Sequence, residues 1–361
     1  MNPIIRLACG DDRTPILRFI NEHWKRDHIF VHSRVLFDWQ HLSSAHAGQF
    51  NFVLALHPTS HDILALLGFI PMSQFSLRLE WSETFLAIWK VRDDIRLPGL
   101  GVGLLESVVR HTQPAMIGVV GISRMAVPLY RVLGFQTGLL DHHVLFNPRR
   151  RTFLIASGVE SRHMPTVAPF DSAVRCVPLT NACASQTIEA LCAASVPRKT
   201  WDYVRHRYLQ HPFYRYQVLG LSRDGALDAI LIARKVHANQ SAALRITDYL
   251  GDAGVLPRFQ GALQNILVSE NAEYLDIYQH GIPDDLLTAA GFVNRRQQPS
   301  LTVPNYFEPF ENANIELDFA YRVYDPLLSG RIRILRGDGD QDRPNQLPQD
   351  QNGGSQWTEP N

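Results

Sequence analysis

Lysine is scarce in this sequence, and so is any excess of charge. Lysine occurs only at Lys25, Lys90, Lys199 and Lys235, so arginine carries nearly all of the positive charge. The 35 basic residues are balanced by 35 acidic ones, which leaves no basic excess of the kind that binds nucleic acid or an anionic membrane broadly. We therefore expect neither nucleic acid nor a membrane among the partners.

Paired cysteines and long apolar runs are also missing. The sequence has four cysteines without a C-x-x-C pair, namely Cys9, Cys176, Cys183 and Cys192. This favours reduced, buried thiols over a disulfide framework or a zinc site. The longest apolar stretch, residues 63–72, is too short to span a bilayer, and the first residues lack the pattern of a secretory signal. These observations predict a soluble, cytoplasmic protein.

The chain is long enough for two domains, and its second half repeats the order of the first. It has 361 residues, of which 45% are hydrophobic and 19% charged, so about two globular domains are expected. Residues 4–146 show the order β-α-α-β-β-β-α-β-α-β, and similar signals return after residue 174. The clearest echo is Leu129-Tyr-Arg-Val-Leu-Gly-Phe135 against Leu286-Leu-Thr-Ala-Ala-Gly-Phe292. We interpret this as a degenerate internal duplication.

These signals also predict helix caps and domain limits. Asp12 or Thr14 is expected to cap the first helix and Ser33 the second, and residues 136–146 are expected to supply the strands that close the first sheet. The predicted organisation is a first domain over residues 1–147, a linker over 148–173, a second domain over 174–330, a C-terminal strand and turn over 331–345, and a disordered tail over 346–361.

The most informative segment is a glycine-rich loop between a strand and a helix. The strand at 84–91 is followed by Gly99, Gly101 and Gly103, and the loop opens directly into a helix. Several backbone N–H groups can converge there on a phosphate. Leu104 breaks both the dinucleotide pattern G-x-G-x-x-G and the Walker pattern G-K-[ST]. A glycine-rich turn without a ligand is the remaining alternative.

The loop and a second motif together resemble the GNAT acyl-CoA N-acyltransferases. Arg96-Leu-Pro-Gly99-Leu-Gly101 is similar to the family signature Arg/Gln-x-x-Gly-x-Gly/Ala, and a register two residues later, with Pro98 in the first position, fits almost as well. At the expected distance, Ala126-Val-Pro-Leu-Tyr130-Arg-Val-Leu-Gly-Phe135 is similar to the family's A-x-x-L-Y-x-x-L-G-F helix.

The resemblance implies an α/β (α+β) chain with a tandem GNAT fold, in which each half is a mixed, mostly antiparallel sheet flanked by helices. It implies that the strands at 84–91 and 116–121 splay apart and that the pantetheine of acetyl-CoA or another acyl-CoA inserts between them. The residues that it implies for acyl-CoA binding are Val91, Arg96, Gly99, Leu100, Gly101, Val102, Gly103, Leu104 and Ser123.

Acyl transfer to an amine needs a neutral amine and a proton for the leaving thiolate. Tyr130 matches the family's proton-donor position, and its alternative role is a phenol packed under the cofactor. Asp94, at the end of the strand at 84–91, is the predicted base, acting directly or through water; alternatively it pairs with Arg92 or Arg96. The hydroxyl of Ser123 either binds a ligand or caps the following helix.

The second half lacks the phosphate loop, because Asp252 and widely spaced glycines stand in its place. We expect this half to shape an acceptor pocket at the domain interface. The tandem arrangement and three further segments, at 211–216, 304–310 and 337–345, resemble GNAT enzymes that act on nucleotide-linked amino sugars for bacterial surface polysaccharides. The acceptor-binding residues that this suggests are Asp93, Tyr306, Phe307, Glu308 and Arg343.

The acidic run Gly337-Asp-Gly-Asp-Gln-Asp-Arg-Pro-Asn345 has two interpretations. Its carboxylates either satisfy a tight turn and pair with Arg343, or they contact the substrate. It lacks the glutamate of a calcium loop, so no metal is expected. Two other functions stay open: acyl transfer to another small amine or to an aminoacyl or peptide acceptor, and a non-catalytic acyl-CoA-binding module. The oligomeric state is not predicted.

Overall fold

The computed structural model describes residues 2–77, 83–169, 171–194 and 196–347, so residues 348–361 of the predicted disordered tail lie outside it. Within these residues the strands form two large sheets and a short hairpin. In spatial order, the first sheet contains β1 (Ile4–Cys9), β2 (Gln49–Leu56), β3 (Ile63–Pro71), β4 (Thr84–Val91), β5 (Met116–Ile122), β16 (Asp318–Val323) and β6 (Gln136–Leu139).

The second sheet repeats this order with strands of the second half and one strand, β7, of the first. It contains β8 (Val174–Pro178), β9 (Tyr216–Arg223), β10 (Ala226–Ala238), β11 (Ser241–Gly251), β12 (Tyr274–His280), β7 (Asp141–Phe146) and β13 (Val293–Asn294), with β17 (Ile334–Leu335) added on β12. Each sheet has a parallel pair at the same place, β4 with β5 and β11 with β12, among antiparallel neighbours. The predicted mixed, mostly antiparallel fold is thereby confirmed.

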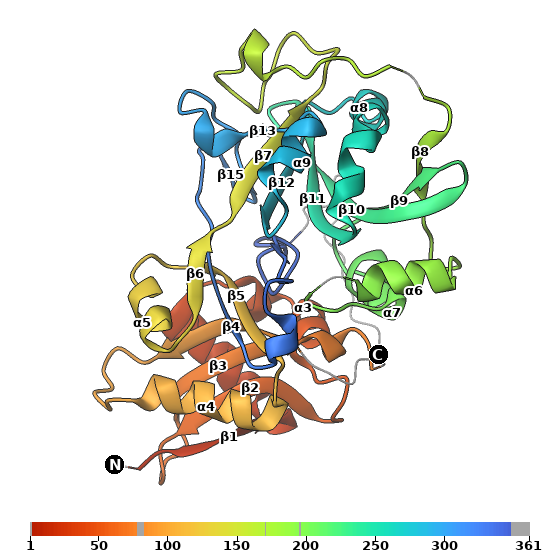
Figure 1. Cartoon of the computed structure of the whole chain (residues 1–361). Helices are drawn as coiled ribbons and strands as arrows, with labels where there is room; N and C mark the ends of the chain where they lie inside the picture. Colours follow the sequence, from red (N-terminus) through yellow and green to blue (C-terminus); the bar gives the residue numbers. More distant parts are fainter. Residues whose placement is uncertain (1, 78–82, 170, 195, 348–361) are drawn as a thin grey trace, which may run out of the picture.

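The two halves exchange one strand each. In Figure 1 the yellow ribbon leaves the red-to-orange half at β6 and enters the other half as β7. There β7 pairs with β12 over its full length, whereas β16, from the second half, lies between β5 and β6 of the first sheet. The expectation that residues 136–146 close the first sheet is therefore correct for β6 and wrong for β7. The domain limits expected at residues 147, 173 and 330 stay a prediction.

Helices flank both sheets. They are α1 (Arg13–Phe19), α2 (Ile29–His32), α3 (Arg34–His41), α4 (Leu100–Thr112), α5 (Val127–Val132), α6 (Gln186–Ala193), α7 (Trp201–Val204), α8 (Gln260–Ser269) and α9 (Asp284–Ala289). Ser33 caps α3 as predicted, by accepting the Leu36 N–H at 3.2 Å. Asp12 instead pairs with Arg6 and accepts the Cys9 N–H, so its side chain does not cap α1.

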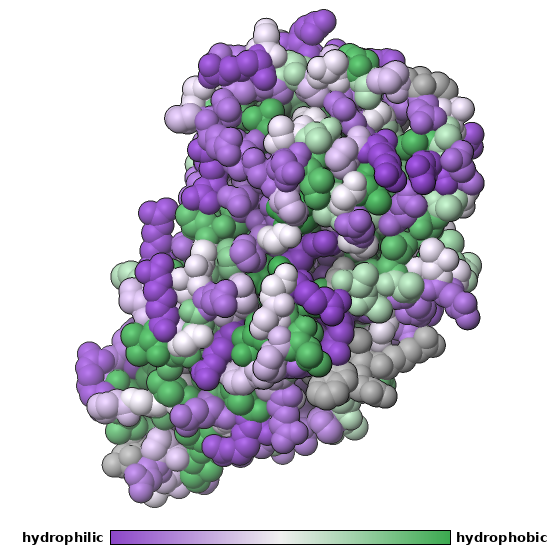
Figure 2. All heavy atoms as spheres, viewed as in Figure 1, coloured by the Kyte–Doolittle hydropathy of each residue, from purple (hydrophilic) through white to green (hydrophobic). Residues whose placement is uncertain are grey.

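A shared core joins the halves. One apolar cluster combines Phe85 and Met116 of the first sheet with Tyr278 and Ile334 of the second half. The strand exchange and this core hold the two sheets together. On the face that Figure 2 shows, polar and apolar residues are interspersed over both halves. None of the described helices is long and apolar enough to cross a bilayer.

The four cysteines are free thiols, but they are not all buried. Cys192 is fully buried as expected, whereas Cys9 is exposed at the end of β1, and Cys176 and Cys183 are half-buried. The expectation of buried thiols is thus wrong for Cys9.

Candidate acyl-transfer site

The strands β4 and β5 pair only at their first residues and then diverge. Their parallel register covers Thr84 with Ile117 and Phe85 with Gly118, while the other edge of β5 pairs with β16 along its whole length. The two strands therefore form a V whose closed end lies at Phe85. This is the splayed pair that the GNAT resemblance implied.

A pocket of about 680 Å³ occupies the opening of this V. Its walls are β4, β5, the start of α4 and α5, with Trp24 at the rim. The described residues that line it include two charged side chains, Asp340 and Arg343, both from near the end of the chain. The remaining lining is mostly apolar, which suits a long, flexible organic ligand anchored at a few polar points.

The wide end of the V meets the N-terminus of α4. Gly99 precedes the helix in the left-handed conformation, at φ +79°, which glycine adopts without strain. A Cβ at Gly101 would lie 3.4 Å from Nε1 of Trp89 on the pocket wall. The first N–H groups of a helix have no partner within it and form the positive end of its dipole. The loop can therefore bind a phosphate at the mouth of the pocket.

The structure brings most, but not all, of the predicted acyl-CoA contacts to this pocket. Those that line it are Val91, Gly99, Leu100, Gly101, Val102 and Ser123. Three others lie away from it: Arg96 is exposed and donates to the Asp93 carbonyl, Gly103 faces Ile5, and Leu104 is buried in the core behind α4.

Tyr130 lies in the pocket wall, with 4% of its surface exposed. Its ring meets the edge of Trp89 at 5.7 Å between centroids, and burial raises the pKa of its phenol. A raised pKa keeps the phenol protonated, so it can donate but not act as a base. Ser123 is exposed at the pocket and does not cap α5, whose N-cap is Ala126.

The two carboxylates expected beside the thioester lie outside the pocket. Asp94 forms a two-fold hydrogen bond with Arg92, at 3.0 and 2.6 Å, and this contact lowers the pKa of its carboxyl. Asp93 is 89% exposed and pairs with Lys90 at 2.6 Å. The structure therefore favours the alternative considered for Asp94, a loop carboxylate engaged with a neighbouring arginine.

Residues 334–345, the C-terminal segment, supply the charged side chains of the pocket. Gly339 packs over Phe85 at the closed end of the V, where its Cβ position lies 3.4 Å from Cβ of Phe85. Further along, the amide of Gln341 lies directly against the backbone of Gly121 on β5. Asp340 stands between these two contacts. Gln341 is not among the residues predicted from the sequence, whereas Asp340 is predicted only as one carboxylate of the acidic run, which either satisfies a tight turn or contacts the substrate.

The aspartates on either side of Asp340 anchor the segment in the second half. Asp338 pairs with Lys199 at 3.0 Å. Asp342 pairs with Arg234 at 2.9 Å and accepts the Tyr216 hydroxyl at 2.6 Å. Both carboxylates are fully buried. They are thus structural, as one interpretation of the acidic run expected, but their partners are Lys199 and Arg234 and not Arg343. The two pairs hold the loop between them over the pocket.

Arg343, a predicted acceptor contact, lies in the pocket beside Asp340. Its Nε is 3.5 Å from the Asp340 carboxylate, and its Nη2 donates to Nε2 of His28 at 3.0 Å. Burial and the charge of Arg343 lower the pKa of His28 to about 2. A neutral imidazole therefore accepts from the guanidinium and fixes its orientation.

The other three predicted acceptor contacts are not in this pocket. Tyr306 and Phe307 form β14, which pairs with β15 (Phe310–Glu311), and the guanidinium of Arg245 covers the Phe307 ring at 5.0 Å. Glu308 accepts the Tyr214 hydroxyl at 2.9 Å. Phe307 and Glu308 thus contact other residues of the second half, and none of the three lines the pocket that holds Arg343.

The equivalent V of the second sheet is filled by the C-terminal segment. The strands β11 and β12 are parallel over three residue pairs, from Leu244 with Leu275 to Ile246 with Ile277. Beyond them β17 pairs with β12, and Gly337 donates to the Thr247 carbonyl of β11 at 2.8 Å. The chain itself thus takes the position that the pocket occupies in the first sheet.

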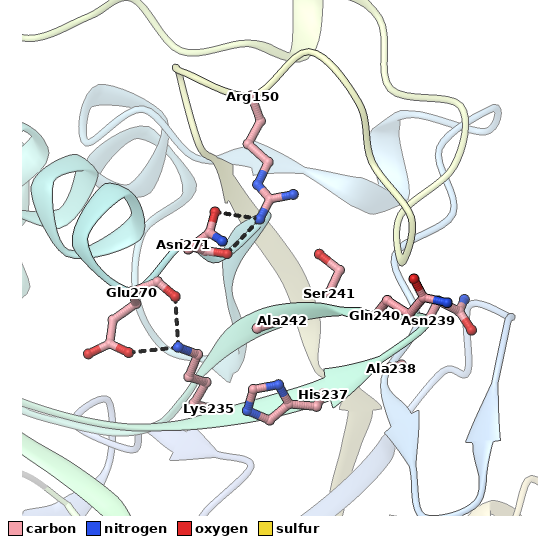
Figure 3. Close-up of a pocket in the computed structure, with 10 residues that line it drawn as sticks. All are labelled: Arg150, Lys235, His237, Ala238, Asn239, Gln240, Ser241, Ala242, Glu270 and Asn271. Carbon is pink, nitrogen blue, oxygen red and sulfur yellow. Dashed lines mark hydrogen bonds and ion pairs between the residues drawn. The ribbon is translucent and has the colours of Figure 1, made fainter.

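A second hollow lies at the far end of the β10–β11 hairpin. Figure 3 shows its cations turned toward neighbours: Lys235 contacts Glu270 at 3.0 Å and Arg150 contacts Asn271 at 2.8 Å. Because both cations already contact neighbouring side chains and the hollow is open to solvent, it is a weaker candidate for a ligand site than the pocket in the V.

Comparison with known proteins places the fold. No family model and no curated protein matches the chain. A GCN5-related N-acetyltransferase from Anabaena variabilis superposes with a TM-score of 0.50 at 10% identity, over 89% of this chain and 72% of that one. A protein of unknown function from Enterococcus faecalis, described as a probable N-acyltransferase, superposes with a TM-score of 0.52 at 9% identity, over 90% of this chain and 73% of that one. At such identities the likeness concerns the fold alone, and that fold is a tandem GNAT fold.

Proposed function

We propose that this chain is an N-acyltransferase that moves an acyl group from acyl-CoA to an amine. The observation that carries the proposal is the V between β4 and β5, which opens onto the N-terminus of α4. If the phosphates of acyl-CoA bind at Gly99 and Gly101, its pantetheine arm can extend between β4 and β5 toward Phe85. The loop N–H groups bind the anion, and Tyr130, held protonated by burial, can give a proton to the leaving thiolate.

For the acceptor we propose a nucleotide-linked amino sugar of bacterial surface polysaccharide synthesis. Trp24 at the pocket rim, 46% exposed, offers an aromatic face to a base, and Arg343 offers a cation to a phosphate. In this proposal Trp24 and Arg343 contact the acceptor, and Tyr306, Phe307 and Glu308 do not. The single lining carboxylate among the described residues argues against a polyamine, which needs several.

Thermal unfolding with acetyl-CoA, CoA, dTDP and UDP, alone and in pairs, tests the proposal. A ligand that binds only the folded state raises its stability, by about 2.7 kcal/mol at a hundredfold excess over Kd. We expect a shift with CoA that Gly101→Val removes, because the valine projects from the pocket wall, and a further shift with one nucleotide. A shift with CoA alone points to another amine, and no shift with CoA overturns the proposal.

Turnover separates an enzyme from a binding module. Thiol release from acetyl-CoA is measured with a panel of amines: dTDP- and UDP-linked amino sugars, spermidine, and a glycine-initiated peptide. Binding of acetyl-CoA without release on any amine would identify a non-catalytic module.

A further inference from the structure

We propose that Asp340 is the carboxylate that binds the acceptor's ammonium and takes its proton. The inference rests on the proposed acyl transfer and assigns its base to the C-terminal segment. Asp340 lines the pocket in the V, and among the described lining residues it carries the one acidic group. Its side chain is 12% exposed, which is enough for contact with a ligand in the pocket.

The position of Asp340 along the V fits the end of the cofactor that reacts. If the phosphates are at the mouth, beside Gly101, the thioester must lie further in, toward the closed end at Phe85. Gly339 covers Phe85 there, and Gln341 contacts Gly121 across the opening. Asp340 lies between Gly339 and Gln341 in the chain and lines the pocket, with its carboxylate 3.5 Å from Nε of Arg343. We therefore place it near the point where the amine must meet the thioester.

The flanking ion pairs explain why this carboxylate is fixed in place. Lys199 pairs with Asp338 and Arg234 pairs with Asp342, and both carboxylates are fully buried. In the acidic run, Asp338 and Asp342 thus anchor the loop to the second half, and Asp340 between them lies in the pocket of the first half. A group oriented in advance costs less to order when the reaction occurs.

Acyl transfer to the ammonium form of the acceptor releases two protons from its nitrogen. The ammonium of the acceptor gives one proton to Asp340, and the neutral nitrogen attacks the thioester carbonyl carbon. The C–N bond forms, the C–S bond breaks, the nitrogen loses its second proton, and the departing thiolate gains one. One proton is released to solvent, and the products are an amide and CoA.

The test compares Asp340→Asn with the wild type, using acetyl-CoA and whichever amine of the panel turns over fastest. We expect kcat/KM to fall at least 100-fold, with acetyl-CoA affinity within twofold of the wild type and with loss of the acidic limb of the pH profile. Asp340→Glu should restore part of the rate. Asp285→Asn, an exposed carboxylate on α9, is the matched control and should leave kcat/KM unchanged.

Three outcomes would overturn the assignment. If Asp340→Asn keeps the wild-type rate, the carboxylate is not used. If Arg343→Gln reproduces the loss and Asp340→Asn keeps the acidic limb, Asp340 only positions Arg343. If Asp94→Asn lowers the rate and Asp340→Asn does not, the base is Asp94. Failure of the wild type on every amine overturns the proposed function itself, so the two failures are distinguishable.

Discussion

The ammonium of Lys199 lies 3.0 Å from the carboxylate of Asp338, and both side chains are almost completely buried. Asp248 of β11 approaches the same ammonium at 2.6 Å. Burial alone would lower the pKa of Lys199, but the two carboxylates outweigh it and raise that pKa above its usual value. One cation thus ties the C-terminal segment to the centre of the second sheet.

Removing this cation should destabilise the whole protein. Lys199→Met leaves two buried carboxylates without their partner, which costs about 3–5 kcal/mol in free energy of unfolding. Urea unfolding at neutral pH measures the loss. Lys235→Met is the control, because its pair with Glu270 is about one-third exposed and should contribute at most about 1 kcal/mol. Equal losses in both variants would contradict this account of the anchor.

The filled V of the second sheet predicts one acyl-CoA site per chain. Gly337 and β17 bridge β11 and β12 where the pocket lies in the first sheet. Isothermal titration with acetyl-CoA should therefore give a stoichiometry of one, and Gly101→Val should remove it. A stoichiometry of two, or a second site that persists in the variant, would show that the C-terminal segment leaves the second V.

The contact between His28 and Arg343 predicts a pH dependence of stability. The pKa of His28 is about 2 in the fold and about 6.5 in an unfolded chain. Between these values the unfolded chain binds the proton and the fold does not, so stability is retained above pH 6.5 and falls as the pH drops toward 2. From pH 7 to 5 this residue alone should remove about 2 kcal/mol.

Urea unfolding at both pH values measures this loss in the wild type and in His28→Gln, which keeps an acceptor for Arg343. The variant should lose less stability on acidification than the wild type. His32→Gln, on a half-exposed side chain nearby, should not change the difference. An unchanged pH dependence in His28→Gln would mean that His28 is protonated in the fold.

Much of the fold could be predicted from the sequence because its signals are local. The glycines before α4 and the Tyr130 helix depend on neighbours in the chain, and residues 99–102 and Tyr130 line the pocket; that they bind acyl-CoA stays a prediction. The exchange of β7 and β16 could not be predicted. The alternation of apolar and polar residues along a strand shows which of its faces is buried, but it does not show which other strand lies beside it.

The choice of base shows the same limit. The sequence favours Asp94 because it follows β4, yet its carboxylate pairs with Arg92, two residues away, and is exposed outside the pocket. Asp340 lies far along the chain and reaches the pocket only because Lys199 and Arg234 hold its neighbours. This placement depends on ion pairs between residues more than a hundred positions apart in the chain. Periodicity and motif spacing do not predict such pairs.

The contact between Gly121 and Gln341 gives the last prediction. Gly121 has φ +79°, and a Cβ there would collide with the Gln341 amide. Gly121→Ala should lower the free energy of unfolding by about 1–2 kcal/mol through backbone strain. It should also displace Gln341 and, with it, the adjoining Asp340. Gly225→Ala is the matched control, since it has φ +81° and no atom within 4 Å of the added carbon. Both variants should lose similar stability in urea unfolding, whereas kcat/KM should fall only in Gly121→Ala. Full activity in Gly121→Ala would mean that the C-terminal segment does not need this contact to position the pocket's carboxylate.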